Sequence, residues 1–230
     1  MSKQKDIEEK NVKATDEGFA TVQQGLNKFE LFFEDHQKAI GIGFIAIIVI
    51  IALGWLVKTQ YLNPLQDEAQ KEIFQAQYYF EADSFNLALN GDGINSGFLK
   101  IIDNYSSTKA GKLANYYAGV CYFKLGDFTN AKKYLADFSS DDDILNTMAI
   151  GLIGDVEVEM GNLDAAIAQF KKAADKGNKV TAPIFLEKLG AVYEKQGKTD
   201  DAVAAYNKLK DFPTSSQAQL ADKLINSIKK

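Results

Sequence analysis

The sequence predicts an all-α protein in which one transmembrane helix precedes an α-solenoid of stacked helical hairpins. Two observations carry this prediction. One is an uncharged, apolar run at residues 39–57, and the other is a pattern of glycine, alanine and large apolar residues that recurs along the chain after that run. We therefore expect residues 66–230 to form one domain with three clear hairpins, a degenerate hairpin before them and a capping helix at the end.

The apolar run, AIGIGFIAIIVIIALGWLV, has the properties of a membrane span. At a rise of about 1.5 Å per residue it extends roughly 28 Å, which matches the hydrocarbon thickness of a bilayer. Lys38 and Lys58 bracket the run, and Trp55 and Tyr61 stand where interfacial aromatic residues are common. A buried core helix is disfavoured because the run has no polar face.

The span reads as an uncleaved anchor. The segment before it is long and acidic, the apolar run exceeds the length of a signal-peptide core, and no small-x-small cleavage site follows it. Charge leaves the orientation open, since Lys28 and Lys38 on one side balance Lys58 and Lys71 on the other.

The residues around the anchor divide into three segments. Residues 1–16 are charged and lack apolar periodicity, so we expect a disordered tail. Residues 17–38 are expected to form an amphipathic juxtamembrane helix, and residues 58–65 a linker. The apolar stripe of that helix consists of Phe19, Val22, Leu26, Phe29 and Phe33. The stripe fits either a helix lying on the membrane surface or a docking helix for a membrane partner.

The repeats are marked by a glycine in the turn of each hairpin. These turn glycines are Gly126, Gly161 and Gly197, which gives periods of 35 and 36 residues. Each is preceded seven residues earlier by another glycine and followed by an alanine and then a large apolar residue. The three sets are Gly119, Ala131 and Leu135; Gly154, Ala166 and Phe170; and Gly190, Ala202 and Tyr206.

Each position has a mechanical reason. The upstream glycine and the alanine let the two helices of a hairpin approach closely, the turn glycine reverses the chain, and the large residue fills the groove between hairpins. Over residues 112–212 this spacing resembles the tetratricopeptide repeat (TPR) pattern, with Tyr122 and Tyr193 at the aromatic position of the first helix and Pro213 closing the third unit.

Two kinds of departure from the TPR pattern stand out. The leading tryptophan position holds Asn115, Ile150 and Leu186, and Glu157 occupies the aromatic position of the second repeat. We expect one unit to be looser than its neighbours for this reason.

The segments that flank the three repeats read as helical too. Residues 66–105 are interpreted as the degenerate hairpin, broken at residues 90–93 by Asn-Gly-Asp-Gly. Its apolar residues are Ile73, Phe74, Tyr78, Phe80 and Phe85 in the first helix, and Phe98, Ile101, Ile102 and Tyr105 in the second. Ser215 and Ser216 are expected to cap a last helix over residues 216–229.

Composition argues against catalysis and against nucleic-acid binding. All 26 cationic residues are lysine in a chain of net charge −5, so the arginine that reads phosphates and bases is missing. His36 and Cys121 are the sole histidine and cysteine, which excludes a His/Cys metal site and a nucleophile–histidine pair in the repeats. Cys121 is expected to be a small buried residue, and Asp141 to Asp143 a solvated turn and helix cap. We expect neither an enzyme nor a bound cofactor.

The TPR resemblance implies a binding groove lined by the first helices. The positions that would face it are Tyr116, Val120, Phe123, Lys124, Met148, Asp155, Glu159, Glu187, Ala191, Glu194 and Lys195. This groove would run from aromatic to acidic and suit an extended peptide with apolar and basic character, although each residue is also typical of an ordinary helix surface. A clamp for chaperone carboxylates is excluded, because its positions hold Tyr116, Val120, Leu152, Ile184 and Lys188, and four of these are apolar or aromatic.

A short tail, one anchor and a TPR domain of this size resemble the YfgM-like ancillary subunit family of the bacterial SecYEG translocon. The resemblance implies an inner-membrane protein with a cytoplasmic N-terminus and a periplasmic TPR domain. Its implied partners are the translocon, a membrane-anchored prolyl isomerase and client polypeptides. Two alternatives stay open: a structural scaffold of another cell-envelope or secretion complex, and a cytoplasm-facing import receptor of an organelle.

Overall fold

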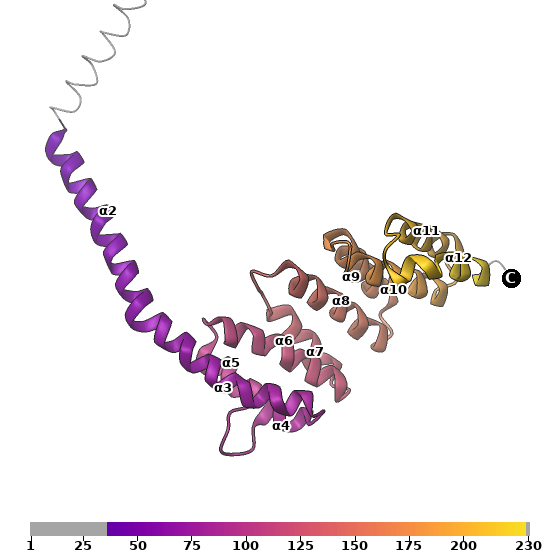
Figure 1. Cartoon of the computed structure of the whole chain (residues 1–230), viewed down its shortest axis with the longest axis horizontal. Helices are drawn as coiled ribbons and strands as arrows, with labels where there is room; N and C mark the ends of the chain where they lie inside the picture. Colours follow the sequence, from indigo (N-terminus) through magenta and orange to yellow (C-terminus); the bar gives the residue numbers. More distant parts are fainter. Residues whose placement is uncertain (1–35, 229–230) are drawn as a thin grey trace, which may run out of the picture. The chain divides into compact units, whose positions relative to one another are not determined.

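The computed structural model describes residues 36–228, and all the regular elements among them are helical (Figure 1). Their bounds are α2 Gln37–Val57, a π turn Lys58–Leu62, α3 Asn63–Glu81, α4 Phe85–Asn90, α5 Phe98–Tyr105, α6 Lys109–Lys124, α7 Phe128–Asp137, α8 Asp143–Glu159, α9 Leu163–Lys176, α10 Ala182–Lys195, α11 Thr199–Lys208, a 3-10 turn Leu209–Asp211, and α12 Ser216–Ile228. The predicted all-α class is confirmed. The chain divides into two compact units, Met1–Tyr61 and Leu62–Lys230.

Helix α2 contains the apolar run of the first unit. It begins at Gln37 and ends at Val57, and none of its residues is buried. Within the described part of the chain, it belongs to the one helical stretch that is long and apolar enough to cross a membrane. Its side chains pack against no core, which removes support from the buried-helix alternative.

The segment predicted as a linker, residues 58–65, is helical. A π turn at Lys58–Leu62 leads directly into α3, where Pro64 stands in the first turn. Proline lacks an amide hydrogen and its ring crowds the carbonyl four residues earlier, so the wider π spacing just before it relieves that conflict. The hydroxyl of Thr59 donates to the carbonyl of Trp55 at 2.9 Å and satisfies a backbone acceptor there. No glycine interrupts the segment, and the helix continues.

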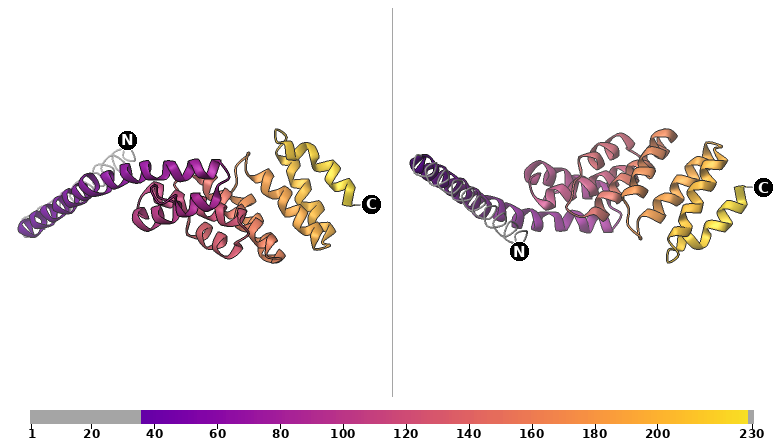
Figure 2. Two further views of the ribbon diagram at one scale, coloured as in Figure 1. Left: turned by 90° about the horizontal axis from the view of Figure 1, so that it is seen from below. Right: turned by 90° about the horizontal axis from the view of Figure 1, so that it is seen from above.

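Three hairpins form the centre of the second unit, as predicted. They are α6/α7, α8/α9 and α10/α11, and they follow one another in chain order (Figure 2). The turn glycines Gly126, Gly161 and Gly197 have φ of 78°, 78° and 72°, a left-handed conformation that glycine adopts without steric cost. Each turn therefore depends on its glycine.

Within each hairpin the upstream glycine lies under the large residue of the second helix. A Cβ placed on Gly119 would come within 2.5 Å of Leu135, and one on Gly154 within 2.6 Å of the Phe170 ring. The third repeat has the same contact between Gly190 and Tyr206, at 2.2 Å. The large residue thus fills the space over the glycine of its own hairpin, which corrects the expectation that it fills only the groove between hairpins.

Glu157, the unusual residue of the second repeat, is buried and paired. Its carboxylate accepts from Lys132 of α7 at 2.6 Å and from Asn162 at 2.9 Å. Burial acts to raise the pKa of Glu157, but the hydrogen bonds from Lys132 and Asn162 outweigh it and hold the pKa below its usual value. The ion pair joins the first hairpin to the second at the position where the repeat pattern has an aromatic residue. Glu157 therefore contributes a contact between the two hairpins.

The predicted degenerate hairpin contains three helices, which corrects its boundaries. Asp83 adopts a left-handed φ of 54° and ends the first helix, so Phe85 lies in the separate helix α4. The rings of Phe80 and Phe85 still pack together at 5.8 Å. Phe74 and Tyr78, expected in this core, are exposed instead. The tight α4–α5 loop is held by Asp92, which accepts from Tyr79, Ile94 and Asn95.

The C-terminal helix closes the solenoid as predicted. Helix α12 buries Ala221 and Ile225 against the cluster that contains Tyr206 and Leu209. The hydroxyl of Ser215 accepts from the amide of Ala218 at 3.1 Å and so caps the helix. The last hairpin is thereby covered.

Gly154→Ala should destabilise the solenoid by about 1–2 kcal/mol, because overpacking against Phe170 outweighs the gain in helix propensity. Urea unfolding of the full-length protein in detergent, followed by far-UV circular dichroism, measures the change. The double variant Gly154→Ala with Phe170→Leu should recover part of the loss, since the smaller side chain makes room for the methyl group. Equal losses in the single and double variants would contradict this account of the close approach.

Lys132→Ala should destabilise the protein by about 2–3 kcal/mol at pH 7, because it leaves the buried Glu157 carboxylate without its charged partner. The pKa of Glu157 is lowered in the folded state, so the ion pair stabilises the fold above the unfolded pKa and is lost as pH falls through the folded pKa. The difference between variant and wild type should therefore shrink in unfolding experiments below about pH 4. Lys133→Ala, at the neighbouring exposed position, is the matched control and should show a small effect without this pH dependence.

Candidate partner-binding groove

The predicted groove begins on α6, where its four predicted positions lie along one side of the helix. Tyr116, Val120 and Phe123 are half-buried and follow each other at three- and four-residue spacing, with Lys124 exposed beside them. The same stripe continues toward the start of the helix through Lys112 and Leu113. The groove surface on α6 is thus longer than the sequence prediction.

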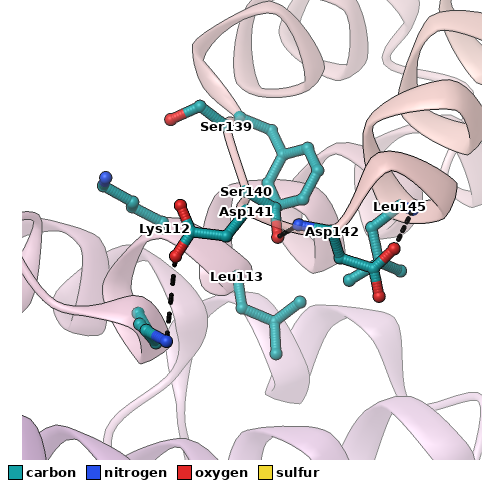
Figure 3. A pocket seen from close by; sticks show the side chains of 9 residues that line it. Lys112, Leu113, Ser139, Ser140, Asp141, Asp142 and Leu145 are labelled. Carbon is teal, nitrogen blue, oxygen red and sulfur yellow. Dashed lines mark hydrogen bonds and ion pairs between the residues drawn. The ribbon is translucent and has the colours of Figure 1, made fainter.

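A cavity of about 500 Å³ lies at the beginning of this stripe, between the first turns of α6 and α8 (Figure 3). Its apolar side chains are Leu113, Phe138 and Leu145. Its polar lining comes from Lys109, Lys112 and Ser139 to Asp142 in the α7–α8 loop. The cavity therefore offers apolar contact and charged groups within one small surface.

The loop that forms one wall of this cavity is held by hydrogen bonds (Figure 3). Asp142 caps α8, as predicted, by accepting from the amides of Ile144 at 2.8 Å and Leu145 at 3.3 Å. Its own amide donates to the Ser140 hydroxyl at 3.0 Å. A loop ordered in this way presents its side chains in a preformed arrangement.

The charges at the cavity are not fully compensated. Lys109 and Asp141 are 3.8 Å apart, and both are so exposed that solvent screens the pair. Lys112 forms no ion pair with any described residue, and the Asp142 carboxylate is engaged at the helix start. A cation that the sequence analysis did not assign to the groove is thus available at the start of α6, in addition to the predicted Lys124.

Tyr116 and Phe123 have a structural role besides facing the groove. The ring of Tyr116 packs on Phe138 at 5.4 Å, and that of Phe123 on Phe128 at 5.9 Å. Both belong to the apolar cluster around Leu135. Burial raises the pKa of Tyr116, which accords with a ring held largely inside the fold. Removing these rings would perturb the core, so their truncation does not test the groove by itself.

The acidic part of the groove contains internal contacts. Asp155 of α8 is bound by Lys188 of α10, with both carboxylate oxygens within 2.7 Å of Nζ. Glu194 accepts from the Tyr206 hydroxyl, which, together with burial, raises the pKa of that tyrosine. Met148 and Glu187 are half-buried, and Glu159, Ala191 and Lys195 are exposed. Glu159 and Lys195 are therefore the side chains best placed to meet a partner.

Sequence reasoning missed the cavity residues. Lys109, Lys112 and Leu113 carry the signal that could have found them, because they extend the three- and four-residue spacing of Tyr116 backwards by two turns. Phe138 and Leu145 come from different elements, and nothing in the spacing places them opposite α6. The predicted docking stripe of Phe19, Val22, Leu26, Phe29 and Phe33 lies outside the described residues.

The described residues bring together no group of three or more His, Cys, Asp or Glu side chains that could hold a metal ion. Cys121 is fully buried, and burial raises the pKa of its thiol to about 12. A thiol in that state is a poor nucleophile at neutral pH.

Comparison with known proteins agrees with this architecture. The family described as "Tetratricopeptide repeat-like domain" matches residues 31–229. The chain belongs to this family. The match includes the apolar helix α2 together with the repeats, so both parts lie within one family pattern. No curated protein matches the sequence.

Two crystal structures of MamA have a similar fold. One is 18% identical to this chain, covers 70% of it and 86% of the MamA chain, and superposes with a TM-score of 0.52. The other is 19% identical, covers 67% of this chain and 88% of the MamA chain, and gives a TM-score of 0.50. At this level of identity the likeness concerns the fold alone, and a TPR fold of this kind indicates protein–protein interaction.

Tyr116→Ala should lower the free energy of unfolding by about 2 kcal/mol, less than truncation of a fully buried ring, because it removes the contact of a half-buried ring with Phe138. Lys112→Ala, on the same stripe but exposed, should leave stability within about 0.5 kcal/mol of wild type. Urea unfolding of both variants checks this. Equal stability of Tyr116→Ala and wild type would show that the ring belongs to the surface only.

Proposed function

We propose that this protein is a non-enzymatic, membrane-anchored TPR adaptor that serves as an accessory subunit of the Sec translocon or of the periplasmic chaperone network. The observation that carries the proposal is an apolar helix of 21 residues, none of them buried, which precedes the helical hairpins within one match to the tetratricopeptide repeat-like family. Such a helix is costly in water and stable in a bilayer. The proposed location is the bacterial inner membrane, with a cytoplasmic N-terminus and a periplasmic TPR domain.

The groove on the first helices is the proposed contact surface for client polypeptides and for a membrane-anchored prolyl isomerase. It starts with the cation of Lys112 and the apolar cavity, and it ends with the exposed Glu159 and Lys195. An extended segment with an apolar centre and charged flanks fits this sequence of contacts. The contact surface of the groove is small, so we expect each polypeptide to bind weakly. Attachment to the membrane raises the effective concentration of the TPR domain near the translocon.

A structural scaffold of another envelope or secretion complex is the alternative. A scaffold would use the same membrane anchor and the same TPR fold. It would bind one fixed partner, whereas an adaptor binds changing clients. A cytoplasm-facing import receptor of an organelle differs further in the side of the membrane that carries the repeats.

Affinity purification of the full-length protein from its native membrane in mild detergent, followed by mass spectrometry, tests the proposal. We expect recovery of SecY-type channel subunits or a membrane-anchored isomerase. Consistent recovery of a different envelope complex without the channel would replace the translocon assignment by the scaffold.

The groove is tested separately by a photo-cross-linking amino acid at Lys124, with the same substitution at Lys223 of α12 as the matched control; both side chains are exposed. Partner cross-links should form at position 124 and be absent or much weaker at position 223. The pair Lys112→Glu and Glu159→Lys should reduce cross-links at position 124 by about tenfold, the size expected for reversing two contact charges. Equal cross-linking at both positions would remove the groove from the proposal and leave the adaptor role to another surface.

A further inference from the structure

A second cleft, of about 390 Å³, lies between α7, α8 and α9. Its apolar residues are Leu135, Phe138, Ala149, Ile150 and Ile153, and its polar residues include Gln169, Lys172 and Lys176 of α9. No TPR position used to define the groove belongs to it. We call this surface the α7–α9 cleft.

On α8 the residues of the α7–α9 cleft and those of the groove lie on different sides of the helix. On α8 the cleft residues Asn146, Ile150 and Ile153 are spaced four and three apart, and so they form one stripe. The groove residues Met148, Asp155 and Glu159 form another. At about 100° of rotation per residue the two stripes lie on opposite sides of the helix. The two surfaces adjoin at Phe138, which lines both the cleft and the cavity at the start of the groove, but on α8 they use different side chains.

The charge of the α7–α9 cleft is of one sign. Lys172 and Lys176 are one turn apart on α9, both are exposed, and neither forms an ion pair with any described residue. None of the residues that line the cleft is acidic. The cleft thus combines two uncompensated cations with an apolar floor. This pairing is complementary to a ligand that combines negative charge with large apolar side chains.

The neighbouring cleft of α9, α10 and α11 shows how specific this arrangement is. It is lined by Lys171 and Lys208, but Asp175 and Asp201 stand beside them. Lysines on the two sides of α9 thus belong to two surfaces, of which one is cationic and the other mixed. The cleft of α9, α10 and α11, with its mixed charge, is therefore a matched control inside the same molecule.

We propose that the α7–α9 cleft is a second binding site, which takes an acidic, apolar polypeptide segment in which carboxylates alternate with large aliphatic or aromatic side chains. The carboxylates contact Lys172 and Lys176, the amide of Gln169 donates to the segment, and the apolar side chains enter the cleft over Ile150 and Ile153. This goes beyond the proposed function, because it gives the protein two faces with different ligand chemistry.

Fluorescence anisotropy with the full-length protein in detergent micelles tests the site. The probe is a labelled octapeptide in which glutamate and leucine alternate. The pair Lys172→Glu and Lys176→Glu should weaken its binding by about tenfold or more, since each exchange turns an attraction into a repulsion. The pair Lys171→Glu and Lys208→Glu changes the net charge by the same amount and should leave binding within about twofold of wild type.

Each other outcome overturns the proposal. Equal weakening by both pairs would assign the binding to general charge, and tighter binding of a peptide with lysine in place of glutamate would reverse the inferred chemistry. Lack of any binding by the wild type would remove the site. The groove pair Lys112→Glu and Glu159→Lys should not affect this probe, so failure here leaves the proposed function untouched.

Discussion

The close approach of two helices over a glycine is the contact on which the rest of this domain depends. Gly119, Gly154 and Gly190 each leave the space that Leu135, Phe170 or Tyr206 occupies. A methyl group at any of them would overlap the opposing side chain. The distance between the two helices of a hairpin therefore cannot change without a clash or a void. Once that separation is set, the turn glycines fix the reversal and the hairpins can stack only in one register.

That register explains both what the sequence could predict and what it could not. Gly126, Gly161 and Gly197 recur at regular spacing, and local conformational demands of this kind are visible in one sequence. The pairing of Lys132 with Glu157 is not visible in the sequence, because it joins two hairpins and places a buried charge where the repeat pattern has an aromatic residue. Likewise, Phe85 lies in a separate helix because Asp83 turns the chain, and no glycine or proline in the sequence indicates a turn at that position.

The candidate groove shows the same limit at the level of function. Tyr116 and Phe123 share one stripe of α6, yet periodicity cannot tell a ring that faces a partner from one that packs on Phe138 or Phe128. Asp155 was read as an available acid, but Lys188 binds it from the next repeat. Position along a helix is therefore predictable from spacing, whereas availability depends on residues that are distant in the chain.

Two opposite faces of α8 bear different chemistry, and the reason lies in the solenoid itself. Each first helix buries one side against its own hairpin partner and another against the adjacent hairpins. Two narrow surfaces of the helix stay accessible, one along the groove and one beside the second helices. Because α8 is held between α7 and α9 by apolar contacts, its two strips keep a fixed relation to each other. A rigid helix with ligands on both sides can hold two polypeptides at once without either displacing the other. When both segments belong to one partner, the second contact is intramolecular, and the combined affinity exceeds that of either contact alone.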